Sequence, residues 1–244
     1  MISIIVCNHD YSQFIPVLMQ AYNKHPFDKD EVEMIIVDDN STKDNFLSYL
    51  RLSMILVEPW FKVRAFETHN NITKNNVLPD NVGVRQCKGD IIILNPIDVV
   101  PCTDVLPIIY ERHKEVPNLY LYPSFFLSFG GWVKGYDKWQ VTTCGSSMRK
   151  ETYELLGGQD ERFIGHCNSD VNFVVRIQQG PFAFVKDERL IYAHLHDVFC
   201  NGVCPGVEPP ALGGHKANVD KAWGQIDTLE EINLQELIRK EDVK

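Results

Sequence analysis

The stretches ISIIVCNHD at residues 2–10, MIIVDDNST at 34–42 and DIIILNPID at 90–98 decide the fold that the sequence predicts. Each contains a run of mostly β-branched residues, which is typical of a strand covered on both faces. Segments with helical spacing lie between them, at 14–24 and 81–88. Strands that alternate with helices predict an α/β protein, with a mostly parallel, doubly wound sheet and helices on both faces.

Weaker patterns extend this prediction along the chain. Further strands are expected at 54–57, 63–66 and 119–122, and further helices at 43–50, 150–156, 170–178 and 226–240. Ser41 or Thr42 is expected to cap the helix at 43–50, and Gly89 to end the helix at 81–88. The aromatic, glycine-rich stretch 125–140 favours a loop or a hairpin.

The composition excludes several classes of protein. Hydrophobic residues make up 44% of the 244 residues and charged residues 23%, as in a folded domain rather than a disordered chain. A formal net charge of −9 disfavours binding to nucleic acid. No apolar run approaches the ~20 residues that cross a bilayer, and the N-terminus lacks a signal-peptide pattern. Seven scattered cysteines favour reduced thiols, so we expect a cytoplasmic protein.

Polar residues follow each of the three apolar runs. Asn8 and Asp10 follow the first, Asp39 the second and Asp98 the third. Ligands of an open parallel sheet bind beyond the carboxyl ends of its strands, so these side chains are expected at one site. Carboxylates there suit hydrogen bonds to a nucleoside, and a Mg²⁺ or Mn²⁺ ion that bridges phosphates. The sequence has no P-loop and no G-x-G-x-x-G stretch, which disfavours simple kinases and dinucleotide-binding enzymes.

Four blocks in order carry a family resemblance. They read ISIIVCNHDYSQF from residue 2, MIIVDDNSTKDN from residue 34, DNVGVRQCKGDIIILNPIDVVP from residue 80 and GGQDERFIGHCNSDVNFVVRI from residue 157. Together they resemble the inverting glycosyltransferases of family 2, which have the GT-A fold. The resemblance covers residues 1 to about 197. It implies a Rossmann-like, mostly parallel sheet and a smaller acceptor-side C-terminal subdomain.

The resemblance also implies roles for matching residues. Asn8 and Asp10 would border the nucleotide base, and Asp39 would bind the base or the ribose. Asp98 would hold the divalent metal ion that stabilises the departing nucleoside diphosphate. Asp170 stands at the position of the general base, which takes the proton of the acceptor hydroxyl.

A second metal ligand is expected in the run His194-Leu195-His196-Asp197. This run resembles a downstream histidine that completes the metal site in several relatives. Alternation along an extended segment puts His194 and His196 on one side, so either could reach the ion.

The sequence departs from the family pattern at three positions. Only Asp98 remains of the family's D-x-D element, where Asn95 and Ile97 replace aspartates. Asp80 replaces the arginine before Asn81, and Arg85, one turn later, is the candidate to substitute for it at the nucleotide. Ser169 replaces the glutamate before Asp170.

The favoured function is transfer of a sugar, with inversion, from a nucleotide-sugar donor to an acceptor hydroxyl. UDP is favoured by analogy, and the acceptor would be a polysaccharide or other glycan, a glycolipid or a protein. Trp132 and Trp139 are candidates for stacking on an acceptor sugar. Two alternatives stay open: an inactive nucleotide-sugar-binding subunit, and, less favoured, a sugar nucleotidyltransferase. The second is less favoured because such enzymes need a glycine-rich, basic phosphate loop after the first strand, and this sequence has none there.

One domain is expected over residues 1–244. Residues 1–101 would form its nucleotide-sugar-binding half and residues 102–200 its acceptor and catalytic half. Residues 201–225 are rich in proline and glycine and would form a flexible loop or lid, and residues 226–244 a C-terminal helix. Any association with a membrane would be peripheral.

Overall fold

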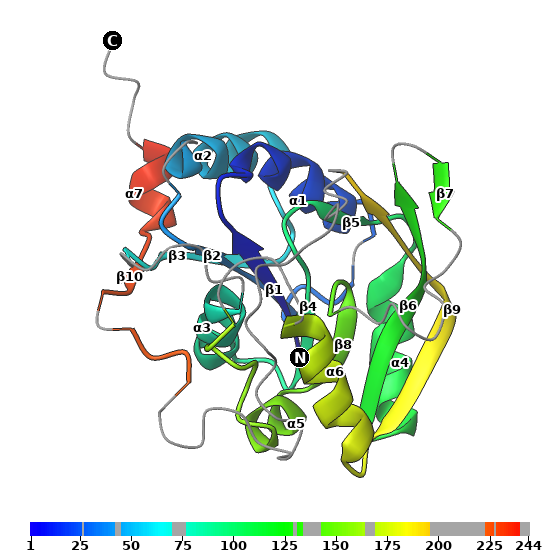
Figure 1. Ribbon diagram of the computed structural model, residues 1–244. Helices are drawn as coiled ribbons and strands as arrows, with labels where there is room; N and C mark the ends of the chain where they lie inside the picture. Colours follow the sequence, from blue (N-terminus) through cyan, green and yellow to red (C-terminus); the bar gives the residue numbers. More distant parts are fainter. Residues whose placement is uncertain are drawn as a thin grey trace.

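The structure is a computed structural model that describes residues 1–25, 27–41, 45–69, 77–128, 131–133, 143–163, 169–195, 223–226 and 228–239. Its strands form one ten-stranded sheet with the order β10-β3-β2-β1-β4-β8-β6-β9-β5, and β7 pairs with β6 outside this path. Helices lie above and below the strands (Figure 1). The expected α/β class is therefore confirmed.

The centre of the sheet is parallel. It consists of β3 (Lys62–Glu67), β2 (Val32–Asp38), β1 (Ile2–Asn8) and β4 (Ile91–Leu94). Every residue of β2 and β4 is buried, as expected for strands covered on both faces. Asn8 pairs with Asp38, and Asp38 pairs with Glu67, so three strands end at one edge of the sheet. We call this the carboxyl edge.

The other half of the sheet is mixed. Strand β8 (Ser146–Arg149) runs antiparallel to β4, whereas β6 (Leu119–Ser128) and β9 (Ala183–His194) are parallel to each other. The short strand β5 (Val99–Pro101) runs antiparallel to the end of β9. Strand β7 (Gly131–Val133) forms a hairpin with β6, as the aromatic stretch allowed. The β5–β9 pair brings His194 beside the residues that follow β4.

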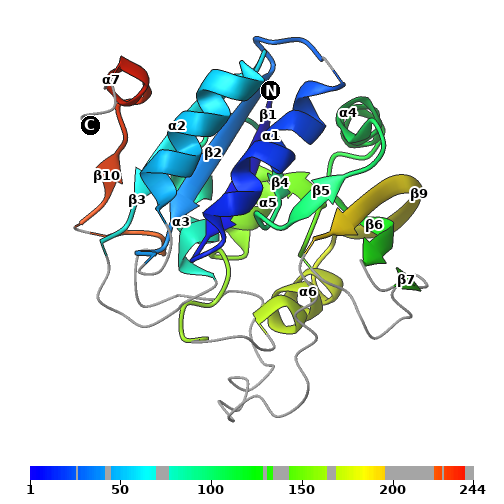
Figure 2. The same cartoon turned by 90° about the horizontal axis from the view of Figure 1, so that it is seen from above.

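Two hydrophobic layers enclose the sheet. On one face, which we call the first face, the sheet packs against α1 (Ile15–Asn23), α2 (Phe46–Val57) and α4 (Val105–Glu115). On the second face, the sheet packs against α3 (Leu78–Gln86), α5 (Lys150–Leu155) and α6 (Ser169–Gln179). Figure 2 looks onto the first face, where α1 and α2 lie in front of the strands. In the chain, the short 3-10 helix η1 (Ser12–Phe14) directly precedes α1.

Two predicted elements were wrong. Met54–Val57 is not a strand but the last turn of α2, because an apolar run of four residues carries no period of its own. The helix expected at 226–240 is helical only over α7 (Leu234–Arg239) among the described residues, and Glu230–Glu231 form strand β10 instead. Strand β10 pairs with the open edge of β3, a tertiary contact that helical spacing does not reveal.

Two expected helix ends were also wrong. Helix α2 starts later than expected and is capped by Asn45, whose side-chain oxygen accepts a hydrogen bond from Ser48 N. Helix α3 ends at Gln86 and not at Gly89. Gly89 instead donates its N–H to Ser3 Oγ, and a Cβ at this position would lie 2.5 Å from that oxygen.

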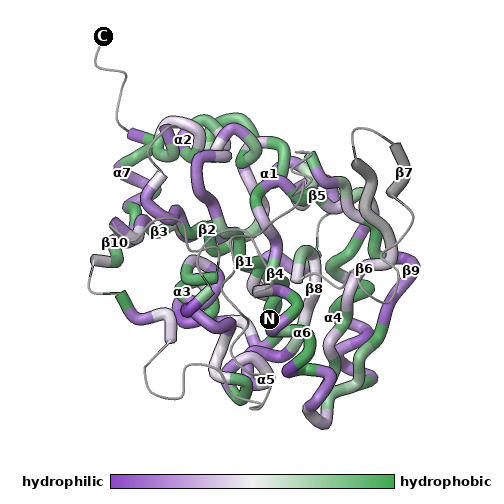
Figure 3. Tube along the Cα trace, viewed as in Figure 1, coloured by the Kyte–Doolittle hydropathy of each residue, from purple (hydrophilic) through white to green (hydrophobic). Residues whose placement is uncertain are grey.

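Hydrophobic residues gather along the central strands (Figure 3). In the described part of the chain, no helix combines the length and the apolar character that a bilayer crossing requires.

Candidate functional site

The ends of β1 and β2 are tied together at the carboxyl edge. Asn8 is buried, and its Nδ2 donates to Asp38 Oδ1 and to Ser12 Oγ. Asp38 also accepts from the backbone N–H and the hydroxyl of Ser41. The Ser41 hydroxyl oxygen in turn accepts from the N–H of Asp10, which has a left-handed φ of 61°. Asp38 therefore holds the loop between residues 38 and 41, and the Asn8 side chain is hydrogen-bonded to it.

Asp39 is the next residue and lies against β3. It is 3% exposed, its Oδ1 accepts from Thr68 Oγ1 at 3.3 Å, and its N–H donates to Asn8 O. The ring of His9 contacts Asp39 O through Nδ1 at 2.7 Å. Thr68 and Ser41 are site residues that sequence reasoning missed: Ser41 was considered only as a helix cap, and no sequence signal marks Thr68.

Asp98 and His194 meet at the end of β4. His194 Nε2 lies 3.2 Å from Asp98 Oδ2, and Leu195 N donates to Asp98 O. The register Val99–His194 of the β5–β9 pair fixes this meeting. The structure thus brings together the predicted carboxylate and the first of the two predicted histidines. His196 lies outside the described residues.

A third group forms around Cys7, the second-to-last residue of β1. Burial, followed by the charges of Asp80, Cys144 and Asp98, raises the pKa of the Cys7 thiol well above its ordinary value. Asp170 acts in turn on Asp80, since its charge raises the pKa of that carboxyl. Cys7, near the end of β1, therefore lies within electrostatic reach of both Asp98 and Asp80. Cys7 was missed because a lone cysteine at a strand end carries no signal.

The start of α3 is locked to the segment that leads into α6. Asn81 Oδ1 accepts from Gln159 N and Tyr153 Oη, while its Nδ2 donates to Gln159 O and Glu161 Oε1. Gln159 Nε2 donates to Asp80 Oδ2 at 2.8 Å. These bonds fix Asp80 against the segment before Asp170.

Arg176 anchors α6, the helix that carries Asp170 in its first turn. Its guanidinium is buried and donates to Leu156 O, Gly158 O and Asn172 Oδ1. Burial lowers the pKa of Arg176 to about 10, still well above neutral pH, so the group stays charged. Asp170 itself is only partly buried, and the residues 164–168 before it are not described.

Among the described side chains, Arg85 is a predicted site residue that lies apart from this group. Arg85 lies on the outer side of α3, where it donates to Trp223 O and stacks on the Trp223 ring at 5.4 Å. Trp139 lies outside the described residues, and Trp132 is described only as part of the β7 backbone. A role for these three residues stays a prediction.

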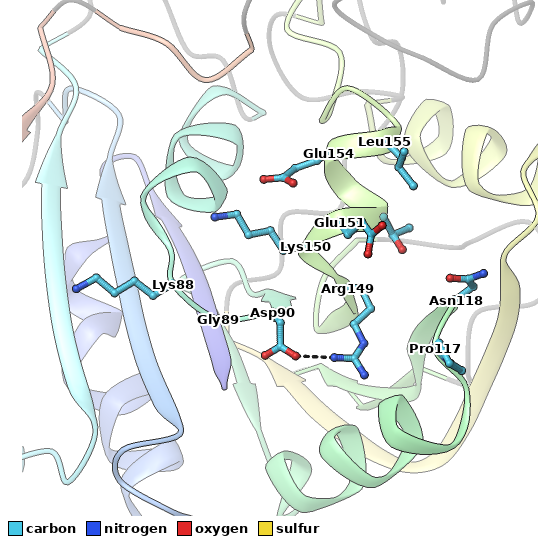
Figure 4. A pocket seen from close by; sticks show the side chains of 11 residues that line it. Lys88, Gly89, Asp90, Pro117, Asn118, Arg149, Lys150, Glu151, Glu154 and Leu155 are labelled. Atoms are coloured by element: carbon cyan, nitrogen blue, oxygen red, sulfur yellow. Dashed lines mark hydrogen bonds and ion pairs between the residues drawn. The ribbon is translucent and has the colours of Figure 1, made fainter.

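Two further features lie away from Asp98. A cavity of about 520 Å³ opens at the opposite edge of the sheet, beside the Asp90–Arg149 ion pair (Figure 4). No predicted site residue lines it. Glu67, which is partly buried, and the exposed His69 and Glu230 form a cluster between β3 and β10 whose potential ligand atoms lie within 4.8 Å of one another.

The model of the family "Glycosyl transferase family 2" matches residues 3–177. The chain therefore belongs to glycosyltransferase family 2. Its central sheet, flanked by helices on both faces, matches the GT-A fold.

Solved structures share this fold. TarS of S. aureus has a TM-score of 0.63 at 17% identity, over 80% of this chain and 36% of that one. Its fragment 1–349 in complex with UDP gives 0.65 at 16% identity, over 80% and 60%. The mannosyltransferase PcManGT from Pyrobaculum calidifontis, in complex with GDP-Man and Mn²⁺, gives 0.60 at 14% identity, over 79% and 56%. The chain thus spans between a third and three fifths of these proteins. No curated protein matches it in sequence.

Proposed function

We propose that the protein transfers a sugar from a nucleotide-sugar donor to an acceptor hydroxyl, with inversion at the anomeric carbon. The nucleoside would lie over Asp39 at the carboxyl edge, and the diphosphate over Asp98. Solved structures with the same fold carry UDP, UDP-GlcNAc or GDP-Man. A UDP-sugar is the favoured donor for this chain, and a GDP-sugar is the first alternative to test.

The contact between Asp98 and His194 is the observation that carries this proposal. Adjacent ligands of an octahedral ion bound at 2.0–2.1 Å lie about 2.9 Å apart. The 3.2 Å between Asp98 Oδ2 and His194 Nε2 is close to that separation. The Asp98 carboxylate would suit Mn²⁺ or Mg²⁺, and the His194 imidazole would be the second protein ligand. A divalent ion held there would supply charge that stabilises the departing diphosphate.

Asp170 is the proposed base. It lies in the first turn of α6, the helix that the buried Arg176 anchors to Leu156 O and Gly158 O. In the transfer step, the acceptor oxygen forms a bond to the anomeric carbon as its proton passes to the Asp170 carboxylate. The bond from that carbon to the diphosphate breaks, and the diphosphate leaves with the electron pair.

A transfer assay with Asp170→Asn tests the proposal. UDP-GlcNAc and GDP-Man are supplied with Mn²⁺ and a panel of sugar acceptors, and ¹H NMR of the product reports the anomeric configuration. We expect an inverted product and a loss of at least ~100-fold in kcat for Asp170→Asn, the usual contribution of a general base. Asp104→Asn, at an exposed aspartate before α4, is the matched control and should keep full activity. Wild-type turnover by Asp170→Asn, or a retained configuration, would refute the assignment.

A specific observation keeps the inactive subunit as a second candidate. Asn95, at the first aspartate position of the family's D-x-D element, is fully buried and bonded to Tyr22 Oη and Val99 O. Ile97 is buried as well. Asp98 is thus the one carboxylate that this loop offers. Calorimetry with UDP and Mn²⁺ separates the candidates, because binding without turnover of any donor would favour the inactive subunit.

A further inference from the structure

A row of acidic residues crosses the sheet towards its β10 edge. Asp38 of β2 pairs with Glu67 of β3, and Glu67 pairs with Glu230 of β10, so the three residues lie on one face of the sheet. Like charges directly opposite each other on neighbouring strands destabilise a sheet. The Asp38 carboxylate accepts hydrogen bonds from Asn8 and Ser41, which offset its charge. The pair of Glu67 and Glu230 calls for a positive charge of its own.

His69, two residues after Glu67, brings a nitrogen ligand to this pair. Its Nε2 lies 3.0 Å from Glu230 Oε2 and 4.0 Å from Glu67 Oε2. The potential ligand atoms of the three side chains all lie within 4.8 Å of one another. Ligand atoms of a tetrahedral Zn²⁺ ion, bound at about 2.0–2.1 Å, are about 3.3 Å apart. The two measured separations lie on either side of that value, and the exposed His69 and Glu230 leave the cluster open to an ion from solution.

The arginine of β3 is engaged elsewhere. Arg64 lies on the opposite face of the strand, where it donates to Glu231 Oε1 and to Gln86 O. Burial raises the pKa of Glu67, the charges of Asp38 and Glu230 raise it further, and His69 lowers it. A divalent cation between the two glutamates would balance both of their charges, whereas a protonated His69 could balance only one.

We propose that Glu67, His69 and Glu230 bind a Zn²⁺ ion that fastens β10 to the edge of β3. One imidazole nitrogen and two carboxylate oxygens are accepted zinc ligands, and a water molecule would complete the tetrahedron. Strand β10 has only two residues, so a bond from each strand to one ion adds a link between them. Thr68, between the two ligands of β3, also accepts a hydrogen bond at its carbonyl from Thr228 Oγ1. The site is separate from Asp98 and does not depend on the proposed sugar transfer.

Calorimetric titration of chelator-treated protein with Zn²⁺ tests the site. The Asp98→Asn variant should still bind a Zn²⁺ ion, because Asp98 is not among the ligands. Glu230→Gln should weaken that binding at least ~10-fold, since a neutral amide replaces an anionic ligand. Glu231→Gln is the matched control: this neighbouring glutamate pairs with Arg64 on the other face, so the variant should keep the wild-type affinity. Circular dichroism checks that each variant is folded.

X-ray absorption at the zinc edge and hydrogen exchange complete the test. The zinc ion should have nitrogen and oxygen neighbours and no sulfur. The amide of Ile232, which donates to Ala65 O beside β10, should exchange ~10-fold more slowly at a free Zn²⁺ concentration of ten times Kd. Glu230→Gln at the same Zn²⁺ concentration should show less of this protection.

Three results would overturn the proposal. Absence of Zn²⁺ binding in the wild type would remove the site. Wild-type affinity in Glu230→Gln, or sulfur among the zinc neighbours, would place the ion on other residues. Zn²⁺ binding that leaves the exchange of the Ile232 amide unchanged would refute the fastening of β10.

Discussion

Replacing Asp80 by asparagine should make the stability of the protein less sensitive to pH. Asp80 has a folded-state pKa of about 7, against an ordinary value of 3.8 that applies to the unfolded chain. The folded protein therefore binds the proton more tightly, and stability falls as the pH rises from about 4 to about 7. A shift of about three pKa units corresponds to about 4 kcal/mol above pH 7. The N-terminus of α3 favours the charged form by only ~0.3–1 kcal/mol, which is too little to reverse the sign.

Urea unfolding of the wild type and Asp80→Asn at pH 5 and pH 8 measures this effect. The variant should gain on the wild type by about 2–3 kcal/mol between these two pH values, because most of the linkage falls in this interval. Titrating groups that do not interact with Asp80 contribute equally to both proteins and cancel in the difference. Asp104→Asn, on the surface, should show a gain near zero. A pH-independent difference between Asp80→Asn and the wild type would refute the reasoning that the buried carboxyl is protonated at neutral pH.

Three further perturbations test the framework of the site. Arg176→Met should lower the free energy of unfolding by ~2–4 kcal/mol, since it strips two buried carbonyls of their donor; an unchanged free energy of unfolding would contradict this anchoring role. Gly158→Ala should cost ~1–3 kcal/mol in the same assay, because its φ is +72° and the new Cβ would lie 2.7 Å from Asn81 Oδ1; no loss would contradict the packing. His194→Ala should weaken Mn²⁺ binding to the UDP-loaded protein at least ~10-fold by electron paramagnetic resonance, and unchanged affinity would exclude this ligand.

The parallel centre of the sheet could be predicted because its strands are buried on both faces. Ile2 to Val6 and Met34 to Val37 are continuous apolar runs, and such runs appear directly in the sequence. The meeting of Asp98 and His194 was expected from family resemblance alone, because no local spacing relates residues so far apart. Strand pairing between β5 and β9 is what brings them together.

The burial of Asp80 could not be predicted from the sequence. An aspartate three residues into a helix suggests a solvated charge that favours the helix N-terminus. Its burial depends on Gln159 and on α6, which arrive much later in the chain. Strand β10 could not be predicted for a similar reason, because its partner strand β3 lies far away in the sequence.

A crystal structure of the protein with UDP and Mn²⁺ tests the central claim most directly. The proposal predicts one Mn²⁺ ion bound by both Asp98 and His194, a diphosphate on that ion and the nucleoside beside Asp39. A nucleotide found instead in the cavity beside Asp90 and Arg149, or an ion that leaves Asp98 unligated, would contradict it.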